Sequence, residues 1–291
     1  MDEVETLRRF NRSYTQRIGL LTESYLDTGR PLGASRLLFE IGASGARVGD
    51  LRCRLGLDSG YTSRLLRRLE DEHLVIVAAD PHDGRQRVVQ LTPTGRREWR
   101  RLDRRSDRVA RGLLDALSER QRAELAVALA GAERLLRAAT VKFARVDPRS
   151  AEAQAALDRY FAELDERFRS GFNAETGGAD DVDGMRPPVG AFVLVRSDDV
   201  TVGCGGVHHI DGRTGEIKRM WIDPAWRGLG LGRRLLAHLE EVARELGRRR
   251  VILDTNETLA EAIRMYERAG YHRIERYNDN PYAHHWFAKA L

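Results

Sequence analysis

Three closely spaced glycines in the second half of the chain could bind an anion. The segment RGLGLG, residues 227–232, follows an expected strand at 216–222 and precedes an expected helix with leucines at helical spacing. Backbone N–H groups at the start of a helix have no partner within it, and the helix dipole favours negative charge there. The segment therefore predicts a site for a pyrophosphate, although the glycines could also form only a tight turn.

The same segment does not fit two other phosphate-binding motifs. No Lys-Ser or Lys-Thr pair follows the glycines, as a Walker loop requires. Arg233 and Arg234 follow Gly232, so the dinucleotide pattern GxGxxG is absent. The remaining interpretation is a backbone anion site at a strand–helix junction.

A second segment strengthens this interpretation. Residues 250–274, RVILDTNETLAEAIRMYERAGYHRI, contain an expected strand ending near Asn256 and a helix with Tyr266 before an Ala-Gly-Tyr turn. With RGLGLG, this pattern resembles the GNAT superfamily of acetyltransferases over about residues 140–291. The resemblance implies an α/β fold with a mixed, mostly antiparallel sheet, and acetyl-CoA as co-substrate. The cofactor-binding residues it implies are Met220, Trp221, Ile222, Arg227, Gly228, Leu229, Gly230, Leu231, Gly232, Arg233 and Asn256.

The resemblance also implies how the donor lies and which residues act on it. Its pyrophosphate would meet the amides of residues 228–233, and its pantetheine would lie between the strands that end at Ile222 and Asn256. Acetyl transfer needs a neutral amine, and removing the proton of a lysine-like amine costs about 4.6 kcal/mol at pH 7. Glu216 aligns with a general base of the superfamily, and Tyr266 with the acid that protonates the leaving thiolate. A solvated strand carboxylate and a packing aromatic are the alternatives.

Polar residues near these positions are candidates for binding the acceptor. Arg219 could pair with a carboxylate, and Asn278 and Asn280 could meet the acceptor, although turn chemistry also explains an Asn-Asp-Asn-Pro sequence. We expect a primary amine on a small molecule, acetylated by direct transfer in a ternary complex. Two other interpretations stay open: a protein-lysine acetyltransferase, and a transcription factor whose second half only senses acyl-CoA.

The first half contains a pattern typical of DNA-binding proteins. Two short helices, expected around Leu51–Leu55 and Leu65–Leu69, are joined at Gly56 by a turn in which Asp58 or Ser59 can cap the second helix. Polar and basic residues lie away from the leucines of the second helix, where they suit base edges and phosphates. These residues are Ser59, Tyr61, Thr62, Arg64, Arg67 and Arg68. A solvated helix face is the alternative.

A hairpin follows directly, with alternating apolar residues on both sides of a Pro/Asp/Gly turn. Arg85 and Arg87 lie near its tip, as in a wing. Residues 1–138 resemble the MarR family of winged-helix regulators, and DGRQRVVQLTPTG matches that family's D-x-R…LT-x-x-G pattern. The resemblance implies a homodimer on a pseudo-palindromic double-stranded DNA operator, with Arg85 in a minor groove.

Apolar stripes on the flanking helices support the dimer independently. The first helix and the two long helices expected within 95–138 carry more apolar residues than one small domain can bury. Packing of these stripes within the same chain is the alternative. A third arrangement would keep the enzyme and make the first half a dimerisation scaffold.

Length and composition agree with a two-domain protein. The chain has 291 residues, 42% apolar and 32% charged, and its basic excess lies in the N-terminal half. We expect a mainly α winged-helix domain at 1–138 and a GNAT domain at 139–291. No apolar run is long enough for a membrane span, and two distant cysteines without CxxC predict no metal site and a cytoplasmic location.

Overall fold

The computed structural model describes residues 2–21, 24–81, 83–84, 86–169, 171–173, 182–198 and 200–291. The chain forms two compact units, Met1–Leu129 and Ala130–Leu291, which we call the N-terminal and C-terminal units and describe separately. The dividing point falls inside one helix, α6, which spans Glu119–Ala139. The last turns of this helix therefore belong to the C-terminal unit.

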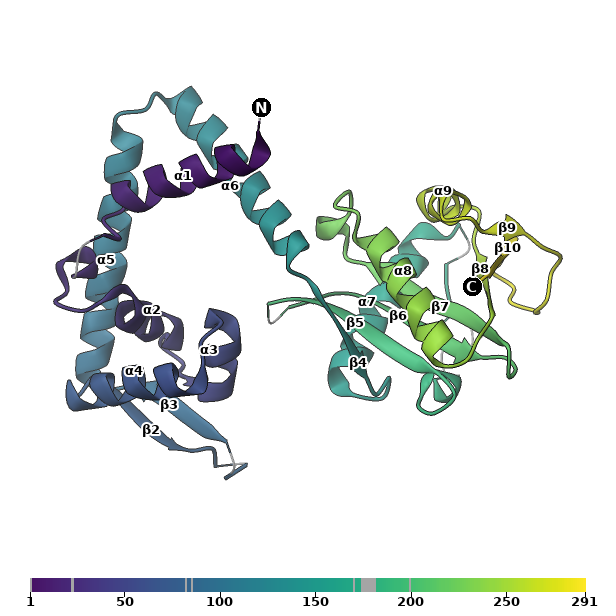
Figure 1. Ribbon diagram of the computed structural model, residues 1–291, viewed down its shortest axis with the longest axis horizontal. Coiled ribbons are helices and arrows are strands. Elements are labelled where there is room, and N and C mark those ends of the chain that lie inside the picture. The colour runs from purple at the N-terminus through teal and green to yellow at the C-terminus, as the bar shows by residue number, and fades with distance from the viewer. Residues whose placement is uncertain are drawn as a thin grey trace. The chain divides into compact units, whose positions relative to one another are not determined.

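The N-terminal unit is mainly helical and carries one small sheet (Figure 1). Its sheet has the order β1-β3-β2, so the expected hairpin β2–β3 is present. The apolar spacing of the sequence predicts a first helix from about Val4 to Asp27, but α1 ends at Arg17, because Gly19 just after it takes a positive φ of 71°. The elements are α1 Glu3–Arg17, η1 Tyr25–Asp27, α2 Leu32–Ile41, β1 Ala46–Arg47, α3 Val48–Leu55, α4 Ser59–Asp71, β2 Val75–Ala79, β3 Arg87–Leu91, α5 Pro93–Asp115 and α6.

The turn between α3 and α4 follows the expected chemistry. Gly56 ends α3 in the left-handed conformation, and the side chain of Asp58 accepts a hydrogen bond from the Tyr61 N–H at 2.8 Å. The helix pair thus has the helix-turn-helix arrangement, and the hairpin β2–β3 follows it. The leucines of α3 and α4, together with those of α2, form one buried core that includes Leu38, Leu51 and Leu69.

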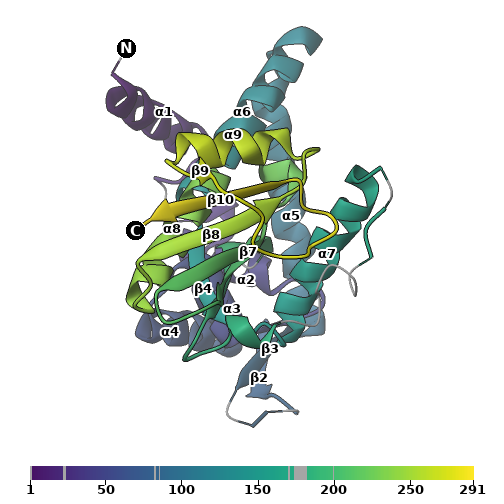
Figure 2. The ribbon, with the colours of Figure 1, turned by 90° about the vertical axis from the view of Figure 1, so that its right-hand side faces the viewer.

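The C-terminal unit is built on a seven-stranded sheet with the order β4-β5-β6-β7-β8-β10-β9. All neighbouring pairs are antiparallel except β7 and β8, so the sheet is mixed and mostly antiparallel, as expected. Figure 2 shows β7, β8, β10 and β9 in this order. The elements are β4 Lys142–Val146, α7 Ala151–Arg167, η2 Asp183–Met185, β5 Ala191–Ser197, β6 Val200–His209, β7 Thr214–Ile222, η3 Pro224–Trp226, α8 Leu231–Glu245, β8 Arg250–Thr255, α9 Ala260–Arg268, β9 His272–Arg273 and β10 His285–Ala290.

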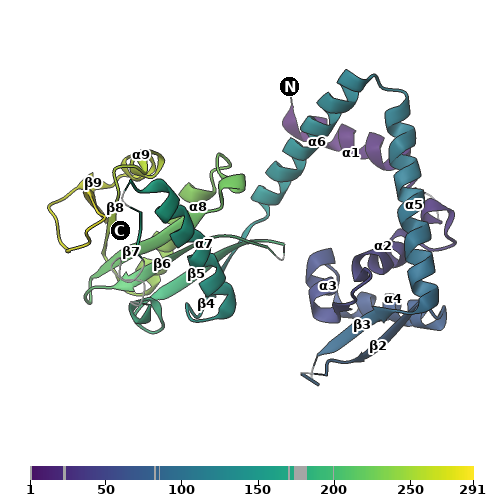
Figure 3. The same ribbon diagram turned by 180° about the vertical axis from the view of Figure 1, so that it is seen from behind.

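Helices cover both faces of this sheet, as Figures 1 and 3 show from opposite sides. Alternate residues of β5 point to opposite faces: Val193 packs in the core with α8, and Phe192 packs in the core with α7. The two buried clusters hold the central strands rigidly between the helices. These strands carry the residues expected to act on a substrate.

Two irregularities of β7 create space beside it. The pairing between β7 and β8 ends at Glu216 and Ile252, although both strands continue, so their remaining residues are unpaired with each other. On its other edge β7 has a bulge, because Arg219 and Met220 together face Gly205 of β6. Arg219 there takes a φ of +56°, which turns the strand locally.

No helix among the described residues is long and apolar enough to span a membrane.

Candidate active site and nucleic-acid surface

The glycine segment forms an open backbone cradle at the start of α8. Gly228 and Gly230 take φ values of +77° and +75°, and Gly230 caps the helix. The first bond back into the turn joins the Arg234 N–H to the Gly230 carbonyl at 3.1 Å. Within the part of the chain that the structure describes, the N–H groups of residues 228–233 donate to no acceptor. They are therefore available to an anion.

Glu163 of α7 fixes one side of this cradle, and the sequence patterns did not indicate it. Its carboxylate accepts hydrogen bonds from Arg227 Nη2 at 2.5 Å and from Trp221 Nε1 at 2.8 Å, and Arg227 Nε also donates to the Ile222 carbonyl at 3.0 Å. Burial raises the pKa of Glu163, but the hydrogen bonds from Arg227 and Trp221 outweigh it, so the pKa lies below its ordinary value. Arg227 is thus held by a charged partner in addition to a backbone carbonyl.

A cavity of about 520 Å³ runs from the cradle to α9. It brings together expected donor-binding residues from β7 and from the cradle, which lie apart in the sequence. Those that line it are Met220, Trp221, Ile222, Arg227, Gly228, Gly230, Leu231, Gly232 and Arg233. Leu229 does not line it, and Asn256 lines a neighbouring cavity instead.

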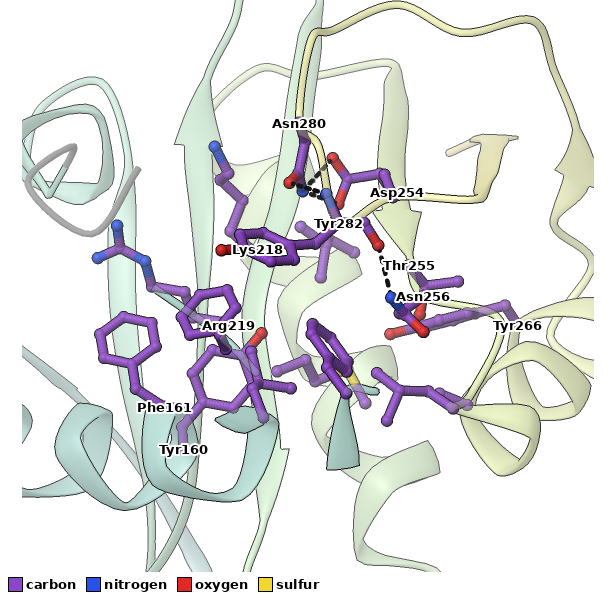
Figure 4. A pocket seen from close by; sticks show the side chains of 18 residues that line it. Tyr160, Phe161, Lys218, Arg219, Asp254, Thr255, Asn256, Tyr266, Asn280 and Tyr282 are labelled. Carbon is purple, nitrogen blue, oxygen red and sulfur yellow. Dashed lines mark hydrogen bonds between the residues drawn. The ribbon is translucent and has the colours of Figure 1, made fainter. Parts of the chain in front are cut away.

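This second cavity, of about 110 Å³, is drawn in Figure 4 and shares lining residues with the first. Tyr160 and Met220 line both, so the two cavities meet beside the bulge of β7. Tyr266, Asn256 and Arg219 also line the second cavity. The structure therefore collects an expected acid, an expected donor contact and an expected acceptor contact around one space.

Tyr266 is buried, and its ring points toward the cavity beside Asn256 (Figure 4). Burial raises the pKa of its hydroxyl, and the negative charge of Asp254 raises it further. The hydroxyl is therefore protonated at neutral pH and can donate a proton or a hydrogen bond. Asn256 uses its amide within the fold, because Nδ2 donates to the Tyr282 carbonyl at 2.7 Å.

Glu216, the expected base, is buried and is not among the residues that line either described cavity. Its Oε1 accepts a hydrogen bond from the Tyr277 hydroxyl at 2.8 Å, and its Oε2 lies 3.4 Å from Lys218 Nζ. Lys218 lines the smaller cavity. Glu216 therefore lies behind Lys218 and Tyr277, and its role as a base stays a prediction.

Asn278 and Asn280 both bind Asp254, a residue that the sequence patterns did not single out. Asn278 Nδ2 donates to Asp254 Oδ2 at 2.6 Å, and Asn280 Nδ2 lies 3.2 Å from both carboxylate oxygens. Asn280 and Asp254 line the smaller cavity, whereas Asn278 does not. Sequence patterns did not indicate a role for Asp254, because it follows a run of apolar residues within one strand. Only the fold places it beside the C-terminal loop.

The outer face of α4 presents basic residues, with one exception to the expected set. Arg64, Arg67 and Arg68 are exposed, and so is Ser59, while Tyr61 is half-buried. Thr62 is 1% exposed and its hydroxyl donates to the Asp58 carbonyl at 2.8 Å. Thr62 therefore belongs to the inner face of α4. The expectation that it faces outward is wrong, because a residue one turn before Leu66 shares the buried side of the helix.

The wing is described only in part. Arg87 begins β3 and is exposed, as a phosphate contact requires. Arg85 lies outside the described residues, so its place in a minor groove stays a prediction. Gln86 Nε2 donates to Asp83 Oδ2 at 2.9 Å, so these two described residues between β2 and β3 contact each other.

Residues 155–271 match the model of the acetyltransferase (GNAT) family, and residues 28–86 match that of the MarR family. An "IAA acetyltransferase" of Azospirillum brasilense is 34% identical over 40% of this chain and 71% of its own length. An "aminoalkylphosphonate N-acetyltransferase" of Salmonella typhimurium is 33% identical over 44% of this chain and 76% of its own length. A solved GNAT-family acetyltransferase from Staphylococcus aureus is 16% identical over 52% of this chain and 99% of its own, with a TM-score of 0.46.

The chain belongs to the GNAT family. Its N-terminal unit is a MarR-type winged-helix region, so both expected families are confirmed. The GNAT domain makes the protein an acyltransferase of the N-acetyltransferase class, a family that uses acetyl-CoA. The geometry of the GNAT domain fits this donor, because free backbone N–H groups lie at one end of the larger cavity and Tyr266 lines the smaller cavity that adjoins it.

The described residues contain no group of three or more His, Cys, Asp or Glu side chains arranged to hold a metal ion.

Proposed function

We propose that the GNAT domain transfers the acetyl group of acetyl-CoA to a primary amine of a small molecule, directly and in a ternary complex. The observation that carries this proposal is the meeting of two cavities at Tyr160 and Met220. The larger one ends in the backbone cradle and fits the pantetheine and pyrophosphate of the donor. The smaller one fits the acceptor, and direct transfer needs both molecules in place at once.

The chemistry follows from the groups around the smaller cavity. The bound ammonium loses a proton to a carboxylate or to water, and the nitrogen lone pair then attacks the thioester carbon. The C–N bond forms, the C–S bond breaks, and the leaving sulfur takes a proton from the hydroxyl of Tyr266. The new amide nitrogen gives up its second proton, which restores the hydroxyl of Tyr266 through water. Glu216 is the base in this proposal and takes the proton directly or through a water molecule.

A small acceptor is favoured over a protein lysine by the size of the cavity. Its volume is about 110 Å³, and residues from α7, β8 and the C-terminal loop surround it. Two relatives have names that specify small molecules with an amine, an amino acid in one and an aminoalkylphosphonate in the other. An extended peptide would need an open groove across the sheet. A lysine of a protein is therefore the less favoured acceptor and is kept as the alternative.

We also propose that the MarR-type unit binds double-stranded DNA at a pseudo-palindromic operator as a homodimer, in the cytoplasm. The exposed arginines Arg64, Arg67 and Arg87 support the DNA contact. Exposed apolar residues on α1 and α6 support the dimer. Loss of DNA affinity in Arg67→Ala at a stated salt concentration tests this part, and unchanged affinity would leave only a scaffold role.

Calorimetry with acetyl-CoA, followed by an assay of thiol release with a panel of amines, tests the enzyme. We expect micromolar donor binding and amine-dependent release of CoA. Binding without release for any amine would favour the alternative in which the GNAT domain only senses acyl-CoA. Absence of binding would remove both interpretations.

A further inference from the structure

Aromatic side chains form a continuous wall of the smaller cavity. The rings of Phe161 and Phe172 stack with centroids 5.5 Å apart, and the rings of Phe172 and Tyr282 lie 4.8 Å apart. Phe168 joins them, 5.9 Å from Phe172. All four rings line the cavity. Such a wall favours a flat apolar group, because aromatic pairs gain energy from stacking beyond the area that they bury.

A carboxylate lies in the same cavity. Asp254 accepts hydrogen bonds from the neutral side-chain amides of Asn278 and Asn280, at 2.6 and 3.2 Å. Among the residues that the structure describes, no Lys, Arg or His nitrogen forms an ion pair with it. The amides position the carboxylate of Asp254 without neutralising its charge, so a bound cation would be its charged partner.

The two cations that line the cavity have other contacts. Lys218 Nζ lies 3.4 Å from Glu216, and the guanidinium of Arg219 lies over the ring of Phe161, 5.8 Å from its centroid. Figure 4 shows the side chain of Arg219 directed toward Phe161, away from Asp254. The charged group in the cavity that an acceptor can pair with is therefore the carboxylate of Asp254.

We propose that the acceptor is an arylalkylamine, whose ammonium group pairs with Asp254 and whose ring stacks on Phe172 and its neighbours. This inference rests on the proposed acetyl transfer. A cavity of about 110 Å³ holds on the order of ten non-hydrogen atoms, if one water-sized probe takes roughly 10–15 Å³. An aromatic ring with a two-carbon amine chain has that size, whereas a lysine within a folded protein brings its backbone as well.

Steady-state kinetics with acetyl-CoA and matched amines test the proposal. We expect kcat/KM for 2-phenylethylamine to exceed that for n-butylamine at least tenfold. Asp254→Asn should lower kcat/KM at least tenfold through a higher KM, with the Kd for acetyl-CoA unchanged. Asp279→Asn is the matched control, because this exposed acid of the same loop pairs only with Arg276 among described residues and should leave both constants unchanged.

The outcomes separate the inference from the function on which it rests. Equal kcat/KM for the two amines, or equal kinetics of the Asp254→Asn and Asp279→Asn variants, would overturn the arylalkylamine proposal while acetyl transfer stands. Absence of thiol release with every amine would overturn acetyl transfer itself. Phe172→Leu is a second test, since it should lower the ratio of kcat/KM for 2-phenylethylamine to kcat/KM for n-butylamine at least threefold, and an unchanged ratio would overturn the stacking role of the wall.

A separate observation concerns the end of α6, which contacts both flanks of the cradle. The guanidinium of Arg137 lies over the ring of Trp226, 5.1 Å from its centroid, and Trp226 lines the donor cavity just before Arg227. On the other flank, Arg234 Nη1 donates to the carbonyl of Ala138. The segment that forms the cradle therefore also holds the last turn of α6.

The last carbonyls of a helix have no partner within it, so their order depends on outside donors such as Arg234. We infer that donor binding at the cradle and ordering of the end of α6 are coupled. Linkage requires the coupling to be reciprocal, so weakening the α6 contact must weaken donor binding by the same factor. α6 is continuous from Glu119 to Ala139, so residues 119–129 of the N-terminal unit belong to the same helix as this contact.

Hydrogen exchange of the full chain with and without acetyl-CoA tests the coupling. We expect saturating acetyl-CoA to slow exchange at residues 133–139 at least threefold. Arg137→Ala should abolish this slowing and weaken acetyl-CoA binding, whereas Arg134→Ala, one turn earlier, should change neither. Slowing restricted to residues 224–234, or equal behaviour of the two variants, would overturn the inference. Failure of acetyl-CoA to bind the wild type would instead overturn the proposed enzyme.

Discussion

The two units of the protein differ in how they cover their apolar residues. In the C-terminal unit, helices of the same chain cover both faces of the sheet, and Leu235 and Phe287 are fully buried. In the N-terminal unit the helix-turn-helix core is buried, but α1 has no buried residue, and Leu7 and Phe10 are about half exposed. α5 buries only Gly95 and Leu102 along its described length.

This difference indicates which surfaces need a partner, namely the exposed apolar faces of the N-terminal helices. A unit whose apolar residues are already covered can hold a complete site within one chain, and the two adjoining cavities of the GNAT domain are such a site. A unit with an exposed apolar stripe lowers its free energy by association. The MarR family implies dimerisation, and the exposed stripe gives that implication a physical cause. Four experiments test this contrast between the two units.

The largest effect is expected in the covered core. Leu235→Ala removes a fully buried side chain of α8 and should lower the free energy of unfolding of the C-terminal unit by about 2–5 kcal/mol. Denaturant unfolding followed by tryptophan fluorescence measures it. Ile210→Ala in the turn after β6, where the residue is 43% exposed, is the control in the same unit and should stay within about 0.5 kcal/mol. Equal effects of the two variants would contradict the comparison.

The next effect concerns the exposed stripe. Phe10→Asp places a charge among apolar residues of α1, where Phe10 stacks on Tyr14 with centroids 5.6 Å apart. If this stripe is the dimer interface, the dimer should dissociate about thirtyfold more readily, which corresponds to about 2 kcal/mol. Sedimentation equilibrium measures it, with Arg9→Ala on the same helix as control. A wild type that is monomeric at all concentrations would disprove the interface.

A third change tests whether the GNAT site is complete within one chain. Tyr266→Phe should lower kcat at least tenfold with unchanged acetyl-CoA affinity, because the leaving thiolate loses its proton donor. The same factor is expected in the Phe10→Asp background. Tyr271→Phe is the control, since that ring packs 5.8 Å from Tyr266 but does not line the described cavities. Unchanged turnover in Tyr266→Phe would exclude Tyr266 as the acid.

The smallest effect is a pH dependence at the cradle. The pKa of Glu163 is below its ordinary value of 4.5 in the folded chain, so its pairing with Arg227 stabilises the fold above about pH 4.5. That stabilisation is lost as the pH falls through the lower folded pKa. Thermal unfolding between pH 7 and 3 should therefore show a steeper acid loss for the wild type than for Glu163→Gln. Parallel curves would show that the pair contributes nothing.

Local patterns were sufficient to predict most elements. Alternating apolar residues between turn residues predict strands at 190–196, 200–209 and 214–222, and these appear as β5, β6 and β7 within one residue at each end. These strands could be predicted because alternating apolar residues and flanking turn residues are both visible within a short stretch of sequence. The first helix was predicted too long, since the apolar spacing continues past Gly19 while the backbone does not.

The two families, the order of elements and the glycine cradle could be predicted from local sequence patterns, because each depends on residues adjacent in the chain. Only the tertiary structure brought Glu163 to Arg227, Asp254 to Asn278 and Asn280, and the aromatic wall to Tyr266. It also moved Thr62 to the inner face of its helix and placed Glu216 behind Lys218. These contacts join residues that lie far apart in the sequence, or depend on which helix face is covered, and both are decided by packing.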